Sequence, residues 1–183
     1  MPRVEKKTKS TAGKPYTCTK CHEPIAPRTE YYSWSFRYGG TYRQHVSCGY
    51  PRRGQLTQSK LASVYNTQDD ANETISKAED CATMADALTS VAEAAREVAE
   101  EYREAVEAMN MAGSGTDNEE RADQLEEWAE ELEEAAEALA DAEFETEDDA
   151  DTESPTNDEG QTEDEWLEER RGEASDALGN CPV

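Results

Sequence analysis

Residues 18–48 read CTKCHEPIAPRTEYYSWSFRYGGTYRQHVSC, and a pair of potential metal ligands stands at each end of this stretch. Cys18 and Cys21 are separated by two residues, as are His45 and Cys48, and twenty-three residues lie between the pairs. A C-x-x-C turn directs two sulfurs to one point, and the second pair completes a tetrahedral set of three thiolates and one imidazole. The spacing predicts a Zn²⁺ site. With four protein ligands no position is left for a reactive water, so we expect the metal to be structural.

A second motif overlaps the first pair. Cys18 to His22 also matches C-x-x-C-H, the attachment signature of c-type haem. Haem would leave His45 and Cys48 without a role, and no apolar export segment follows the basic N-terminus, so we favour zinc. We expect His22 to be an exposed neighbour of the site or an alternative ligand to His45.

The residues between the two pairs predict a β-hairpin. Tyr31 to Tyr38 is rich in β-forming residues, Gly39-Gly40 suits a two-residue turn, and Thr41 to Gln44 returns antiparallel. This pairing would set Trp34 near His45, so we expect the aromatic face of the hairpin to pack over the metal site. Such a short module cannot build an ordinary core, and a bound metal would explain how it folds.

The ligand order resembles that of the poly(ADP-ribose) polymerase-type zinc finger, in which the central gap is longer. The resemblance covers about Tyr16 to Tyr50, including the four ligands, Ile25 and the aromatic strand, and it implies a treble-clef-like fold and recognition of DNA breaks. Arg3 to Tyr65 also resembles uncharacterised small zinc-finger proteins of tailed viruses, in which Pro-Arg-x-x-x-Leu-Thr-x-Ser-Lys follows the module, here Pro51 to Lys60. That resemblance implies a viral or archaeal accessory factor but no particular activity.

The helical part of the chain begins after the module. We divide the chain into a flexible basic arm (1–15), the zinc-finger module (16–55), a long helix (56–112) with a kink near 66–70, a second helix (117–144) and an acidic disordered tail (145–183) with a short helix at 163–171. The long helix follows from the absence of Gly and Pro between Gly54 and Gly113, and the kink from Thr67 with Asp70 three residues later. The tail is acidic and low in apolar residues.

Both predicted helices carry apolar residues at alternating steps of three and four, which predicts a coiled-coil-like helical hairpin. The seam residues are Leu88, Val91, Ala95, Val98, Tyr102, Ala105 and Met109 in the first helix and Leu125, Trp128, Leu132, Ala135, Leu139 and Ala142 in the second. Because many of them are alanine, we expect a homodimer or a protein partner to supply further burial. No stretch approaches the length of a membrane span, so we expect no membrane association.

Charge is divided unequally along the chain. The formal net charge is −25, but residues 1–60 hold twelve basic and three acidic residues, giving +9, and the rest of the chain carries −34. The basic charge of residues 1–60 favours nucleic acid as a partner, and we expect this nucleic acid to be DNA. An acidic body is equally typical of proteins from strongly saline (halophilic) cytoplasms, in which case the acidity reports solvent adaptation. Five cysteines, three of them in the ligand pattern, fit a reducing compartment, so we expect a cytoplasmic protein, or a virion component if the chain is viral.

We therefore expect a structural-zinc nucleic-acid-binding protein. The alternative is a protein–protein adaptor with a zinc head and an acidic helical scaffold. The expected nucleic-acid contacts share a basic or stackable side chain near the module: Arg28, Trp34, Arg37, Arg43, Arg52, Arg53 and Lys60. Phosphate-binding loops, dinucleotide-binding loops and zinc-protease motifs are lacking from the sequence, so we do not expect an enzyme.

Overall fold

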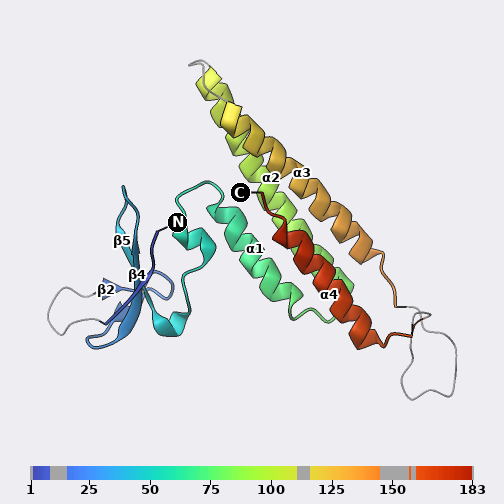
Figure 1. The fold of residues 1–183 in the computed structure, drawn as a ribbon, viewed down its shortest axis with the longest axis horizontal. Coiled ribbons are helices and arrows are strands. Elements are labelled where there is room, and N and C mark those ends of the chain that lie inside the picture. Colours follow the sequence, from blue (N-terminus) through green and yellow to red (C-terminus); the bar gives the residue numbers. More distant parts are fainter. Residues whose placement is uncertain (1, 9–15, 111–115, 145–156, 158–159, 183) are drawn as a thin grey trace. The chain divides into compact units, whose positions relative to one another are not determined.

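A computed structural model describes residues 2–8, 16–110, 116–144, 157 and 160–182 (Figure 1). The chain divides into two compact units, Met1–Ala62 and Ser63–Val183, and each is described by itself. The first is a small β-sheet region and the second consists of long helices. This division agrees with the predicted order of a small β module followed by helices.

The first unit contains two antiparallel sheets. In one, β4 (Glu30–Ser35) lies between β1 (Glu5–Thr8) and β5 (Thr41–His45). In the other, β2 (Tyr16–Thr17) pairs with β3 (Pro24–Ile25). The 3₁₀ helices η1 (Val46–Cys48) and η2 (Arg53–Leu56) follow β5.

Strand β1 corrects the prediction of a flexible arm over residues 1–15. Glu5 lies opposite Ser33 and Thr8 opposite Glu30, so part of the arm is an edge strand. Lys6 also forms an ion pair of 2.9 Å with Glu30. This strand is hard to predict, because a polar edge strand lacks the apolar alternation from which strands are predicted. Residues 9–15 of the predicted arm lie outside the described part of the chain.

The hairpin of β4 and β5 forms as predicted, but with a different register. Ser35 pairs with Thr41, so five residues rather than two connect the strands, and Trp34 lies opposite Tyr42 while Tyr31 lies opposite His45. A type I′ turn needs positive φ at both central residues, and neither Gly39 nor Gly40 has it. Instead, the Gly39 amide donates to the Phe36 carbonyl at 3.3 Å, which closes the turn earlier in the chain.

The second unit contains four helices: α1 (Ala62–Ile75), α2 (Cys81–Asn110), α3 (Thr116–Ala140) and α4 (Glu163–Gly179). The prediction of one helix over 56–112 with a kink near 66–70 is wrong. The interruption lies at 76–80, where the Asp80 carboxylate accepts a hydrogen bond from the Thr83 amide at 2.6 Å and caps α2. Thr67 starts no new helix, because it lies inside α1, where its hydroxyl donates to the Ser63 carbonyl.

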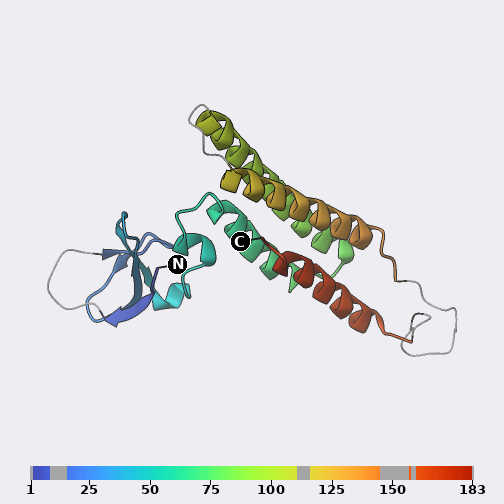
Figure 2. The same cartoon turned by 45° about the horizontal axis from the view of Figure 1, so that its top comes forward.

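Helices α2 and α3 pack as an antiparallel hairpin (Figures 1 and 2). The predicted seam is largely confirmed at the level of burial, since these of its residues are buried: Leu88, Val91, Ala95, Val98, Tyr102, Leu125, Trp128, Leu132 and Leu139. The Arg96 guanidinium forms a double hydrogen bond with the Glu133 carboxylate across the two helices. A supercoil of the coiled-coil type stays a prediction. Helix α3 ends at Ala140, four residues before the predicted end.

Helix α4 corrects the prediction of a disordered tail with a short helix at 163–171. The helix extends to Gly179 and packs on the other helices through Leu167, Ala174 and Leu178. Figure 2 shows it running beside α3. Its C-terminal carbonyls accept hydrogen bonds from other helices, at 2.5 Å from the Gln68 amide to Leu178 and at 3.2 Å from the Trp128 indole to Ala177. Part of the burial that we assigned to a partner therefore comes from the same chain.

Thr162 caps α4 in a capping box with Glu165. Residues 145–156, in the acidic run, lie outside the described part of the chain. Among the helices that the structure describes, none is long and apolar enough to cross a membrane.

Candidate metal centre

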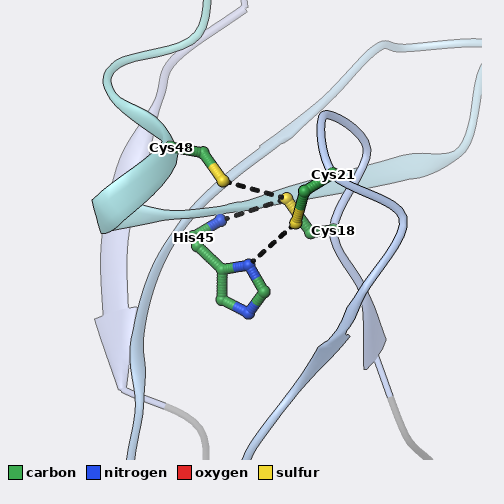
Figure 3. Close-up of side chains that lie close together, drawn as sticks. All are labelled: Cys18, Cys21, His45 and Cys48. Atoms are coloured by element: carbon green, nitrogen blue, oxygen red, sulfur yellow. Dashed lines mark hydrogen bonds between the residues drawn. The ribbon is translucent and has the colours of Figure 1, made fainter.

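The four predicted ligands converge in the first unit (Figure 3). Cys18 and Cys21 lie in the turn between β2 and β3, which is closed by hydrogen bonds from the Cys18 amide to the Glu23 carbonyl (2.9 Å) and from the His22 amide to the Cys18 carbonyl (3.0 Å). His22 turns the chain with a φ of 60°. This tight turn brings both thiols to the same side, as a C-x-x-C motif requires.

The second pair lies where β5 ends. His45 is the last residue of the strand and Cys48 the last residue of η1. The Gly49 amide donates to the Val46 carbonyl at 3.0 Å and closes this turn. Gly49 has a φ of 88°, a conformation that residues with a side chain rarely adopt. A strand end followed by a 3₁₀ turn thus points the second pair toward the first.

The distances among the ligand atoms fit one tetrahedral ion. The Sγ atoms of Cys18 and Cys48 are 3.9 Å apart, and Cys21 Sγ is 3.4 Å from His45 Nδ1. All four ligand atoms lie within 4.8 Å of one another. Metal–sulfur bonds of about 2.3 Å and a metal–nitrogen bond of about 2.0 Å at tetrahedral angles would place sulfurs about 3.8 Å apart and sulfur and nitrogen about 3.5 Å apart. The arrangement matches a Cys3His site.

The thiols of this cluster differ in their tendency to ionise. Burial of Cys18 opposes ionisation, but hydrogen bonds from backbone amides of both ligand turns and from the Cys21 thiol outweigh it and lower the pKa of Cys18 to about 6. The His45 amide, 3.4 Å from the sulfur, is one of these donors. Burial and the neighbouring thiols of Cys18 and Cys21 raise the pKa of Cys48 to about 11. A divalent cation among the sulfurs would offset the repulsion between neighbouring thiolates, so that the remaining thiols ionise as well.

A buried glutamine supports the Cys48 turn. Gln44 is 0% exposed, and its amide nitrogen donates to the carbonyls of Cys48 (3.4 Å) and Gly49 (3.1 Å). Its oxygen accepts from the Gln55 amide at 3.2 Å. The ammonium of Lys20, from the first ligand turn, also donates to the Cys48 carbonyl at 2.9 Å. Sequence reasoning missed both glutamines, since nothing in the sequence of β5 or of η2 marks an amide that bonds to a ligand turn.

The structure removes Trp34 from the expected nucleic-acid contacts. Trp34 is 2% exposed, and its indole donates to the Gln55 carbonyl at 3.1 Å. Its ring stacks on Tyr42 with 5.8 Å between the ring centroids. Trp34 is therefore a core residue of the module, on the sheet face that turns away from the metal cluster, and the expected packing of this residue near His45 is wrong.

The six expected basic contacts all lie in the first unit. Arg28, Arg37 and Lys60 are exposed, and Arg43, Arg52 and Arg53 are half-buried. The Arg43 guanidinium lies 4.0 Å from the centroid of the Tyr16 ring, on the metal-bearing face of the sheet. Arg37 lies 5.3 Å from the centroid of Tyr38 in the loop after β4. His22 is exposed and does not belong to the metal cluster found among the described residues.

Comparison of the chain with protein-family models, with curated proteins and with solved structures finds no match. The resemblances drawn from the ligand order stay predictions.

Proposed function

We propose that the first unit is a zinc-held module that binds nucleic acid. The donor set supports zinc, because three thiolates and one imidazole at tetrahedral spacing suit this ion better than harder cations that prefer oxygen. A turn with one ligand pair, a β-hairpin and a second pair at its end is also the order of a treble-clef-like finger, with η1 in place of the usual helix. Four protein ligands fill the coordination shell, so the metal stabilises the fold and performs no reaction.

The observation that carries this proposal is the separation of charge. The first unit carries a formal charge of +9 over residues 1–60, within a chain of −25. A strongly basic surface attracts the phosphates of nucleic acids and releases their counterions on binding. Solvent adaptation does not account for this part of the chain, because adaptation to salt would make the module acidic like the helices.

Fluorescence anisotropy tests the proposal with the full zinc-loaded chain and labelled DNA and RNA, as duplexes and single strands, over a series of salt concentrations. We expect affinity to fall as salt rises, with a log–log slope of about −0.9 per phosphate contact on duplex DNA and about −0.7 on single strands. Arg28→Ala and Lys60→Ala, both at exposed positions, should each reduce the slope. Arg121→Ala, which removes an exposed arginine from α3, is the matched control and should leave the slope unchanged. Absence of binding at low salt contradicts the proposal, and a protein partner that co-purifies after nuclease treatment would favour the adaptor instead.

A further inference from the structure

A groove lies beside the tip of the β4–β5 hairpin, away from the metal cluster. Its volume is about 380 Å³, and it is formed by the end of β4, the segment after η2 and the chain start. The lining residues are Pro2, Ser35, Phe36, Arg37, Leu56, Thr57 and Gln58. All of them belong to the basic unit.

The lining combines apolar walls with a few polar groups. Phe36 is half-buried and Leu56 is buried, whereas Arg37 and Gln58 are exposed. An exposed amide offers both a donor and an acceptor, and a guanidinium offers several donors. This combination suits a flat ligand that has polar edges and carries a negative charge.

The backbone closes tightly around one wall of the groove. A Cβ atom at Gly39 would lie 2.7 Å from the amide nitrogen of Gln58 and 3.3 Å from the Cβ of Phe36. The loop therefore passes directly over the Gln58 side chain, and any larger residue at position 39 would displace that amide. Position 39 therefore favours glycine because the backbone passes close to the Gln58 side chain, and not because of a positive φ.

Tyr38, next to the lining residue Arg37 in the chain, is a solvent-exposed aromatic residue. Tyr38 is 87% exposed, and its ring is flanked by the Arg37 guanidinium at 5.3 Å. The other large exposed aromatic in the described chain, Tyr50, is 60% exposed and packs against the edge of Tyr32, 5.2 Å between centroids. Neither tyrosine is among the lining residues, but Tyr38 directly follows the lining residue Arg37 and its ring contacts that guanidinium, whereas the Tyr50 ring contacts Tyr32. Tyr38 is therefore the ring on which a ligand in the groove could stack.

We propose that the groove binds an unpaired nucleotide, so that the nucleic acid recognised by the module is single-stranded. The base stacks on Tyr38, the Gln58 amide bonds its polar edge, and Arg37 contacts the adjoining phosphate. The face of a base is hidden in a duplex, and only a base outside the stack can lie on a tyrosine. This inference rests on the proposed nucleic-acid function and specifies its ligand.

The test compares a labelled 12-nucleotide single strand with the duplex of the same sequence, using full-length zinc-loaded protein. We expect tighter binding to the single strand. Tyr38→Ala should weaken that binding by about 5- to 150-fold with little change in salt slope, the range measured for loss of one stacked base. Arg37→Ala should lower the salt slope by about 0.7. Tyr50→Ala is the matched control and should bind as the unaltered protein does.

A fluorescent variant gives a second, direct readout. In Tyr38→Trp a stacked base should quench the new indole when the single strand is added, whereas Tyr50→Trp should show no such quenching. The zinc content of each variant verifies that the module is folded. Equal affinity of the Tyr38→Ala and Tyr50→Ala variants, or preference for the duplex, overturns the inference while leaving the proposed function intact. Failure of the unaltered protein to bind either probe at low salt would instead overturn the proposed function.

Discussion

The substitution Cys21→Ser distinguishes a module that is stabilised by a bound metal from one that is stabilised by its own side-chain contacts. Cys21 is exposed, and its thiol contacts the His45 imidazole at 3.4 Å. If no metal binds, replacing an exposed thiol by a hydroxyl of similar size should change the unfolding free energy by less than about 0.5 kcal/mol. If zinc binds, the substitution removes one of four ligands.

The expected magnitude follows from the four-ligand geometry. Structural zinc contributes about 10–16 kcal/mol to small modules, so an equal share per ligand is about 2.5–4 kcal/mol. This share corresponds to a loss of zinc affinity on the order of 100- to 1,000-fold. Zinc titration in competition with a chromophoric chelator measures this loss, and near-ultraviolet circular dichroism shows whether the surroundings of buried Trp34 become disordered.

A second cysteine provides the control. Cys181 is buried in the helical unit and belongs to no metal cluster among the described residues, so Cys181→Ser should leave zinc affinity unchanged. Cys18→Ser is less informative, because Cys18 is buried and its loss would disturb the core with or without metal. Equal zinc affinity of the Cys21→Ser variant and the unaltered protein would refute the reasoning.

Three further predictions concern the supports of the two units. Gln44→Leu should destabilise the zinc-loaded module by about 1–3 kcal/mol in urea unfolding, because the Gly49 carbonyl loses this donor, the Cys48 carbonyl keeps only Lys20, and the Gln55 amide loses its acceptor; an unchanged midpoint would contradict the role given to this amide. Leu178→Ala should cost the helical unit about 2–5 kcal/mol, since Leu178 is 0% exposed, whereas the exposed Asp176→Ala in the same helix should change stability by less than about 0.5 kcal/mol; equal effects would show that α4 is not docked. Hydrogen bonds from the backbone and side chain of Thr83 lower the pKa of Asp80, so its contribution is present at neutral pH and is lost as pH falls through the lowered pKa. Asp80→Asn, which keeps a capping acceptor but cannot titrate, should flatten the acid limb of a plot of melting temperature against pH, and a plot that matches the unaltered protein would exclude Asp80 as its source.

The metal cluster and the helical seam could be predicted because both signals are local. A C-x-x-C turn brings its own two sulfurs together, and the second pair needs only a hairpin to return the chain. The steps of three and four from Leu88 to Tyr102 mark one face of a helix whatever that face packs against. The residues that make up the sequence pattern are thus the same residues that form the metal cluster or the helical seam.

The hairpin register and the helix break depended on competing local signals. Gly39-Gly40 is a strong indicator of a two-residue turn, yet the turn is closed by a hydrogen bond between Gly39 and Phe36. The register of the two strands is therefore shifted by three residues, and Trp34 pairs with Tyr42 instead of His45. Asp80 is an ordinary polar residue in a run without Gly or Pro. Its role as a cap became visible only in the structure.

Helix α4 and Trp34 required knowledge of distant contacts. The hydrogen bonds that hold α4, from Gln68 to Leu178 and from Arg171 to Ala78, join residues about a hundred positions apart in the chain. Its buried residues follow one another at steps of seven and four, which is too sparse to indicate a buried face. Trp34 lies in a strand crowded with aromatic residues, and its sequence position does not tell which of them faces the core.

Metal content and coordination test the central claim most directly. Elemental analysis of protein purified without added metal, followed by X-ray absorption at the zinc edge, should give about one zinc per chain with three sulfurs at about 2.3 Å and one nitrogen at about 2.0 Å. Protein that is folded but free of metal, or a zinc shell made mainly of oxygen, would contradict the account.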